Sequence, residues 1–97
     1  MDADLIHKAL ANPLRREILA WLKAPEGFPH AHAAFAGGVP LSAIQARSGL
    51  SQSTVSAHIA SMIEAGLLVP TRVGSFLLLS RNEEVIAAFV RQMARGL

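Results

Sequence analysis

The chain has 97 residues, of which 52% are hydrophobic and 16% are charged, with a net charge of +2 and no cysteine. This length fits one domain spanning 1–97, and the composition is too apolar for a disordered chain. The lack of cysteine excludes disulfides, thiolate metal sites and cysteine nucleophiles. The acidic N-terminus is unlike a signal peptide, and no apolar run is long enough to span a membrane. We therefore expect a cytoplasmic protein with no membrane partner.

The N-terminal part predicts two helices followed by a long loop. Residues 3–11 place apolar side chains at three- and four-residue spacings, and Asp2 suits the N-cap position. Asn12 and Pro13 then end this helix and begin a second, because Asn caps helices and Pro fits the first helical position. Residues 25–40 hold three of the five prolines and three of the seven glycines. They predict a long loop, with room for a helical turn at 31–36.

The stretch 41–66 has the pattern of a helix-turn-helix motif. Ser42 and Gln45 have the spacing of a capping box that would begin a short helix. Gly49 suits the left-handed residue that ends such a helix, and Ser51 suits the N-cap of the next one. That second helix is predicted to end at Gly66.

The C-terminal third predicts a hairpin over 67–80 and a last helix. Two β-like runs, 67–72 and 76–80, flank Val73-Gly74-Ser75, and a glycine between such runs is typical of a tight turn. Ser80 or Asn82 suits the N-cap of the last helix. The predicted fold is mostly α with one β-hairpin, in the order α-α-loop-α-α-β-β-α.

The second helix of the motif carries the side chains that suit base recognition. With Val55, Ile59 and Met62 facing the core, its exposed start presents Gln, Ser, Thr and Ala, which can bond bases or phosphates or meet a thymine methyl. The helix N-terminus also offers free amides to a phosphate. We predict that double-stranded DNA is contacted by the following residues: Arg47, Ser51, Gln52, Ser53, Thr54, Ser56, Ala57, His58, Arg72 and Ser75.

Three segments together resemble the ArsR type of winged helix-turn-helix transcriptional repressor. They are ALANPLRREILAWL (9–22), LSQSTVSAHIASMIEAGLL (50–68) and TRVGSFLLLSRNEE (71–84). The resemblance covers nearly the full chain apart from 25–40. It implies a dimeric repressor whose second motif helix reads the major groove. It also implies that the hairpin is a wing touching the minor groove or the backbone, and that the first and last helices form the dimer interface.

The terminal helices carry more apolar surface than so small a body can cover, which independently favours a homodimer. The predicted interface residues are Leu5, Ile6, Leu10, Val85, Ile86, Phe89, Val90 and Met93.

The chain departs from the pattern of this family in its positive charge. Relatives commonly carry a second histidine in place of Ala57, a lysine in place of Ala60, and Arg or Thr in place of Ser75. No Lys or Arg occurs between Arg47 and Arg72. Since Lys and Arg supply most salt-dependent affinity for DNA, we expect weaker binding or a flatter salt response, unless Arg15, Arg16, Arg47 and Arg72 make the contacts.

The metal sites of the family have no counterpart among these residues. The helix at 42–48 (SAIQARS) lacks cysteine, and 82–97 lacks histidine. His30 and His32 could bind a metal ion, but Glu26 is the sole further ligand nearby, so we expect no metal site and no cofactor. Catalysis is not expected either, because Ser56 and His58 are two residues apart on a helix and do not face each other.

Two other functions remain open. The same fold can serve as a protein-interaction module, which the low charge would suit. The chain could also be a repressor gated by a metal or another unknown ligand that binds the 25–40 loop. The sequence does not identify the operator, the regulated genes or any inducer, and it does not distinguish an activator from a repressor.

Overall fold

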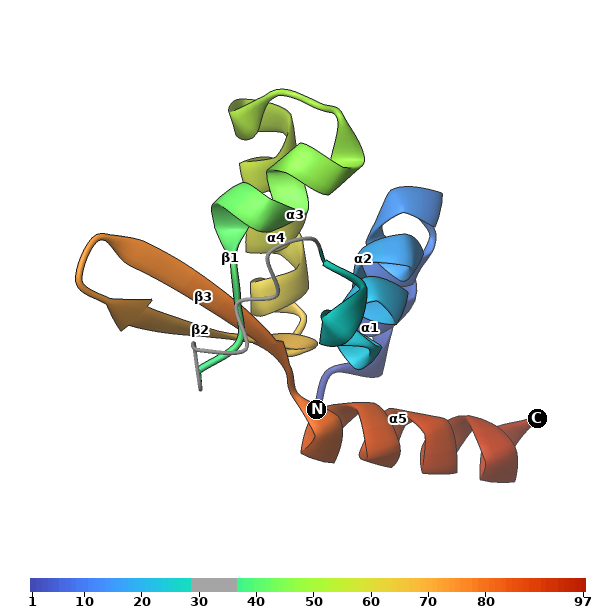
Figure 1. Cartoon of the computed structure of the whole chain (residues 1–97). Coiled ribbons are helices and arrows are strands. Elements are labelled where there is room, and N and C mark those ends of the chain that lie inside the picture. The colour runs from blue at the N-terminus through green and yellow to red at the C-terminus, as the bar shows by residue number, and fades with distance from the viewer. Residues whose placement is uncertain (29–36) are drawn as a thin grey trace.

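The computed structural model describes residues 1–28 and 37–97, so the helical turn predicted at 31–36 lies outside the described residues. Figure 1 shows the arrangement of the elements. In chain order they are α1 (Ala3–Leu10), α2 (Pro13–Lys23), the short 3-10 helix η1 (Pro25–Gly27), β1 (Val39–Pro40), α3 (Leu41–Ser48), α4 (Gln52–Glu64), β2 (Leu68–Val73), β3 (Phe76–Arg81) and α5 (Glu83–Gly96). This is a winged helix-turn-helix fold, as predicted.

Side-chain caps begin most of the helices. The Asp2 carboxylate accepts a hydrogen bond from the Leu5 amide at 3.1 Å, and the Asn12 side chain accepts from the Leu14 amide at 2.9 Å. The Ser51 hydroxyl caps α4 and Asn82 caps α5. Each cap satisfies an amide that has no partner inside its helix. The first three positions agree with the sequence-based expectations, and Asn82 is one of the two candidates that the sequence left open for the last helix.

The capping box predicted at Ser42 and Gln45 is wrong. Helix α3 begins earlier, at Leu41, its N-cap residue is Pro40, and no side chain in the described chain caps it. Pro40 is already paired with Leu78 of β3, so the sheet fixes the chain direction at that point. Ser42 therefore lies inside the first turn of the helix. Gly49 ends α3 with a left-handed φ of 72°, as expected.

The three strands form an antiparallel sheet in the order β1-β3-β2. Strands β2 and β3 are the predicted hairpin, here called the wing, and their register pairs Leu68 with Arg81 and Val73 with Phe76. Gly74, with φ of 57°, and Ser75 form the two-residue turn. Two elements inside the expected 25–40 loop, η1 and β1, have too few residues to show a sequence period.

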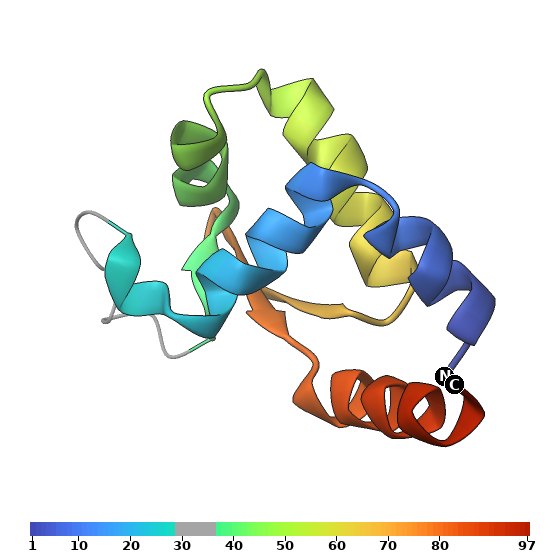
Figure 2. The ribbon, with the colours of Figure 1, turned by 90° about the vertical axis from the view of Figure 1, so that its right-hand side faces the viewer.

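The buried side chains form two hydrophobic clusters. The body cluster joins α2, α3, α4 and the sheet, and consists of Ile18, Leu22, Phe28, Val39, Ile44, Val55, Ile59, Met62, Leu68 and Leu79. The terminal cluster consists of Ile6, Ala9, Ala65 and Leu67, with partly buried side chains of α1 and α5 around it. Figure 2 shows α5 along the base of the molecule, away from the corner between α3 and α4.

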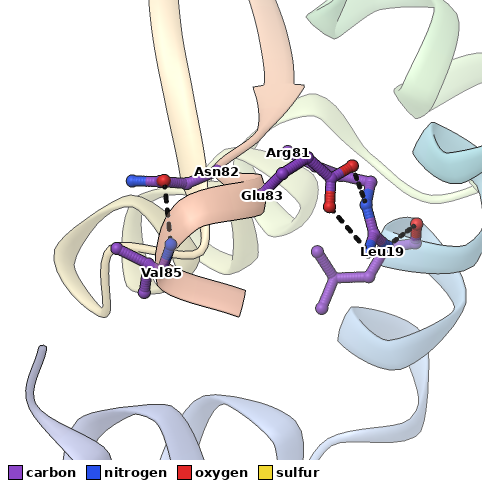
Figure 3. A network of polar contacts seen from close by, with 5 residues as sticks. All are labelled: Leu19, Arg81, Asn82, Glu83 and Val85. Carbon is purple, nitrogen blue, oxygen red and sulfur yellow. Dashed lines mark hydrogen bonds and ion pairs between the residues drawn. The ribbon is translucent and has the colours of Figure 1, made fainter. Parts of the chain in front are cut away.

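A polar network fixes the point where the sheet passes into α5 (Figure 3). The Arg81 guanidinium donates through Nη1 to the Leu19 carbonyl of α2 at 3.0 Å. Its Nε and Nη2 atoms donate to the two carboxylate oxygens of Glu83 at 3.0 and 3.2 Å. This hydrogen bond with Arg81 lowers the pKa of the Glu83 carboxyl below its ordinary value. The direction of α5 is therefore tied to α2.

Candidate nucleic-acid interface

Helix α4 presents one buried face and one exposed face. Val55, Ile59 and Met62 are buried to 2% exposure or less, which places them in the body cluster as predicted. Ser53 and Ala57 are exposed on the opposite face. The other predicted contact residues of this segment divide into an exposed set, Ser51, Gln52 and Thr54, and a half-buried set, Ser56 and His58. The exposed face carries small side chains, so the helix backbone can approach a groove closely.

Three hydroxyl groups meet at the start of α4. The Ser51 hydroxyl accepts from the Thr54 amide at 3.3 Å and donates to the Thr54 hydroxyl at 2.9 Å. The Ser51 and Ser53 hydroxyl oxygens are 3.3 Å apart. Ser51 therefore acts first as the cap, and its bonds orient the hydroxyls of Thr54 and Ser53 at the tip of the helix.

The side of α4 that faces α2 holds an arginine. Arg15 of α2 donates from Nε to the Nδ1 atom of His58 at 3.0 Å, in a partly buried contact. Because Nδ1 accepts this hydrogen bond, it carries no proton in this arrangement. His58 was predicted to contact DNA, and its imidazole is turned toward α2 instead. The bond places the Arg15 guanidinium beside the recognition face.

A hollow of about 460 Å³ lies between α3, the first residue of α4 and the wing. Its polar lining brings together Gln52 of α4, Arg72 of β2 and Ser75 of the turn, three residues of the predicted contact set. Ser42 and Gln45 of α3 also line it, and the sequence reading assigned these two to a cap. Their spacing of three residues puts both side chains on one face of a helix. This spacing could have indicated that they line a common surface. The remaining lining is apolar: Pro40, Leu41, Phe76 and Leu77.

Two other arginines are engaged elsewhere. The Arg47 guanidinium carbon lies 4.7 Å from the ring centroid of Trp21 and 4.9 Å from that of Phe28. This cation–π stack joins α3 to α2 and to the segment after η1. Arg16 donates to the Leu10 carbonyl of α1. Arg15 therefore lies beside α4 through its bond to His58, and Arg72 through the hollow that it shares with Gln52. Arg16 and Arg47 contact other parts of the protein.

The described residues give no support to a metal site or a membrane span. Within 1–28 and 37–97, no three His, Cys, Asp or Glu side chains gather in a way that could hold a metal ion. His30 and His32 lie outside those ranges, so the expectation about them stays a prediction. None of the helices in the described ranges is long and apolar enough to cross a membrane.

Comparison with known proteins supports a regulatory role. Residues 33–72 match the model of the IclR helix-turn-helix domain. Over 89 residues the chain is 34% identical to YbzH of Bacillus subtilis (strain 168), named an uncharacterized HTH-type transcriptional regulator, and the match covers 89% of each protein.

Solved structures share the fold. A crystal structure of an ArsR family transcriptional regulator superposes with a TM-score of 0.75 at 19% identity, covering 96% of this chain and 89% of that one. The homodimeric winged helix-turn-helix DNA-binding domain of Mb0332 from Mycobacterium bovis superposes with a TM-score of 0.67 at 24% identity, covering 96% and 76%. Together with the identity to YbzH, this fold shows that the chain belongs to the winged helix-turn-helix transcriptional regulators.

Proposed function

We propose that this regulator is an ArsR-type repressor that binds operator DNA as a homodimer, with α4 in the major groove and the wing beside it. The observation that carries the proposal is the pair of arginines that border α4. Arg15 is held next to the recognition face by His58, and Arg72 shares a hollow with Gln52 at the tip of α4. Groove-reading helices are flanked by cations in this way because phosphates line both edges of the groove.

The exposed face of α4 suits the interior of the groove. Ser53 and Ala57 project from it and are small, so the helix can enter a major groove about 12 Å wide. Gln52 is long enough to reach an adenine edge, and Ser53 and Thr54 can bond to bases or phosphates. The contact residues that we propose are Arg15, Ser51, Gln52, Ser53, Thr54, Ser56, Ala57, Arg72 and Ser75. His58 positions Arg15, and Arg47 is stacked on Trp21 and Phe28, so neither is included.

The hollow between α3, α4 and the wing is a suitable seat for a backbone phosphate. Arg72 supplies its positive charge, and Ser42, Gln45 and Gln52 supply neutral donors around it. Such contacts fix the register of a protein on the duplex without reading its sequence. The two bordering arginines would then supply most of the salt-dependent affinity.

The homodimer brings two copies of α4 onto one duplex. The apolar stripe of α5 is only partly covered in one chain, with Val90 exposed to 58%, and pairing across a two-fold axis would cover the rest. The Mb0332 domain is described as homodimeric, and it shares this fold. Half-sites about 34 Å apart, one turn of DNA, would fit such a dimer. We further propose that it works in the cytoplasm without a metal or other cofactor and without enzymatic activity.

Alanine substitution at the tip of α4 tests the DNA-binding face. An operator can be obtained by selecting genomic fragments with the purified protein. Gln52→Ala and Ser56→Ala should each weaken operator binding in a fluorescence titration by about 1–3 kcal/mol, the usual value of a base contact. Ser61→Ala, more than one turn beyond Ser56 on the same helix, serves as the matched control. Unchanged binding by both tip variants would contradict the assigned face.

The salt dependence of binding tests the arginine pair. Each phosphate contact contributes about 0.9 to the slope of log affinity against log salt. The double variant Arg15→Ala/Arg72→Ala should therefore lower the slope by about 2, while Arg91→Ala on α5 should leave it unchanged. If selection recovers no DNA and the protein fails to bind heparin, the alternative of a protein-interaction module replaces the repressor.

A further inference from the structure

The hollow between α3 and the wing combines a polar half with an apolar half. A backbone phosphate would use only the polar half, which contains Arg72 and the neighbouring hydroxyl and amide side chains. The apolar half includes Pro40, Leu41 and Leu77. Pro40 is fully buried, and Leu41 and Leu77 are half-buried. Contact with a phosphate therefore does not explain the apolar half.

The register of the sheet places the cation of the hollow directly beside an apolar side chain. Arg72 of β2 is the partner of Leu77 of β3, and directly opposed residues of a hairpin project from the same face. The wing extends from the body on the side of α3 (Figure 1). On α3, Leu41 and Gln45 are four residues apart and share one face of the helix. The wing and α3 thus each contribute an apolar side chain and a polar one to the hollow.

The hollow carries a positive charge that has no counterion in the described chain. Among the described residues, Arg72 is the only charged one that lines the hollow. Within 1–28 and 37–97, the one ion pair is that of Arg81 with Glu83, and no hydrogen bond or ion pair engages the Arg72 side chain. A guanidinium without such a partner attracts an anion, and its parallel N–H groups match the two oxygens of a carboxylate.

The size and polarity of the hollow are those of a small-molecule site. Its volume of about 460 Å³ lies within the range of about 300–1,000 Å³ that is typical of such sites. Those sites combine apolar side chains with a few polar groups that orient the ligand. Ser42 and Gln45 are available for that role, because neither side chain makes a hydrogen bond to a lining residue of the described chain. A small organic acid with an apolar body matches both halves.

From these features we infer that the hollow binds a small organic carboxylate with an apolar body, and that the bound acid displaces operator DNA. The carboxylate pairs with Arg72, and the apolar body lies against Leu41 and Leu77. Arg72 and Gln52 are both proposed DNA contacts and both line the hollow, so the acid and a DNA phosphate compete for it. The binding step is independent of the proposed function, whereas the displacement step rests on it.

Titration of the DNA-free, full-length protein with benzoate tests the binding step. Benzoate has both required parts, acetate has only the carboxylate, and benzyl alcohol has only the apolar body. In two-dimensional NMR spectra, benzoate should cause saturable shifts of the amide signals of Leu41, Gln45 and Leu77. Acetate and benzyl alcohol should each bind at least about tenfold more weakly, because each lacks one of the two contacts.

Substitutions in the hollow assign the two contacts. Arg72→Gln removes the charge and should weaken benzoate binding at least about tenfold. Arg91→Gln makes the same change on α5 and should leave benzoate binding unchanged. Leu77→Ala should weaken the binding of benzoate but not that of acetate, and circular dichroism melting shows whether each variant is folded. If Leu77→Ala unfolds, the comparison of benzoate with acetate on the wild type still measures the apolar contact.

Operator titrations in the presence of benzoate test the displacement step. For simple competition, benzoate at its own dissociation constant should weaken operator binding about twofold, and benzoate at ten times that concentration about tenfold. Sodium acetate at the same concentrations controls for the effect of ionic strength on DNA binding. Benzoate should therefore weaken operator binding more than acetate does.

Three results would overturn the inference. The first is the lack of saturable shifts up to about 10 mM benzoate, which corresponds to negligible affinity. The second is equal binding of benzoate and either acetate or benzyl alcohol, which would mean that the two halves do not act together. The third is saturable benzoate binding with unchanged operator affinity, which would refute displacement. If the wild type binds no DNA, the proposed function fails, and the NMR titration still decides the binding step.

Discussion

In the body cluster, Ile18, Ile44 and Val55 are completely buried by elements of the same chain. In the terminal cluster, Ile6 is also completely buried, but Val85, Ile86 and Phe89 of α5 are only partly covered. None of the α5 side chains, all of which lie in the described part of the chain, is fully buried. The rings of Phe89 and of His7 from α1 pack edge to face, with centroids 5.1 Å apart. The body cluster is thus fully buried within one chain, whereas the apolar side chains of the terminal helices are only partly buried.

This difference indicates a division of roles. In our proposal, the part that reads DNA has a core that is closed within one chain, and the part that would pair two chains is left open for a second copy. Ile6, predicted for the dimer interface, has no surface to offer a partner. The seven other predicted interface residues are each at least partly exposed: Leu5, Leu10, Val85, Ile86, Phe89, Val90 and Met93.

The largest expected effect comes from placing a charge in the open cluster. Phe89→Asp should give monomers or aggregates and abolish operator binding, because burying an unpaired carboxylate costs several kcal/mol at each of two symmetry-related sites. Light scattering and a DNA titration measure the two outcomes. Ala87→Asp puts the same charge at an exposed position of the same helix and should leave both unchanged. A folded wild-type monomer at tens of micromolar protein would refute the dimer.

A cavity in the closed cluster should act differently. Ile44→Ala should lower the free energy of unfolding by about 2–5 kcal/mol in chemical denaturation, since the removed methyl groups come from a packed core. It should leave the dissociation constant of the folded dimer unchanged. Met93→Ala, on the open face, should weaken the dimer with little change in the stability of the body. Identical behaviour of the two variants would show that the clusters are not independent.

The sequence was most informative where structure depends on neighbouring residues. Residue type at the helix boundary predicts the caps at Asp2, Asn12 and Ser51 and narrows the last cap to Ser80 or Asn82, and spacing predicts the buried stripe of α4. The start of α3 was misread because Pro40 pairs with Leu78, a residue far away in the sequence. Local sequence patterns do not predict a partner that is so distant in the chain.

The candidate site shows the same limit. The sequence located the recognition helix and the wing, but not the bond between Arg15 and His58, whose residues are 43 positions apart. It also missed the stack of Arg47 on Trp21 and Phe28. In both cases the sequence gives no partner for an arginine, and the tertiary structure supplies one.

A smaller effect should follow from loss of a cap that belongs to the closed body. The Asn12 side chain accepts hydrogen bonds from the Leu14 and Arg15 amides, so Asn12→Ala should destabilise the protein by about 1 kcal/mol. Ser42→Ala should change stability by less than about 0.5 kcal/mol, because Ser42 caps nothing. Thermal unfolding of both variants gives the comparison. A larger loss in Ser42→Ala would restore the capping box.

The smallest expected effect concerns the link between the two clusters. Leu19 packs against both of them, and Arg81 bonds to its carbonyl while pairing with Glu83. The pKa of Glu83 is lowered in the folded state, first by its hydrogen bond with Arg81. A carboxyl whose folded pKa lies below its unfolded pKa adds stability above the unfolded value and loses it as the pH falls through the folded value. The contribution is small because the Glu83 side chain is 69% exposed.

Comparing Glu83→Gln with wild type at two pH values measures this contribution. At pH near 7 the variant should unfold at a slightly lower temperature, and the difference should shrink in acid, as the pH falls through the lowered folded pKa of the wild-type carboxyl. Glu84→Gln, next to it in the first turn of α5, controls for loss of a charge at a helix N-terminus. A difference that persisted in acid would mean that shape, not charge, matters at Glu83. In that case the Arg81 bond to Leu19 alone would connect the open cluster to the closed one.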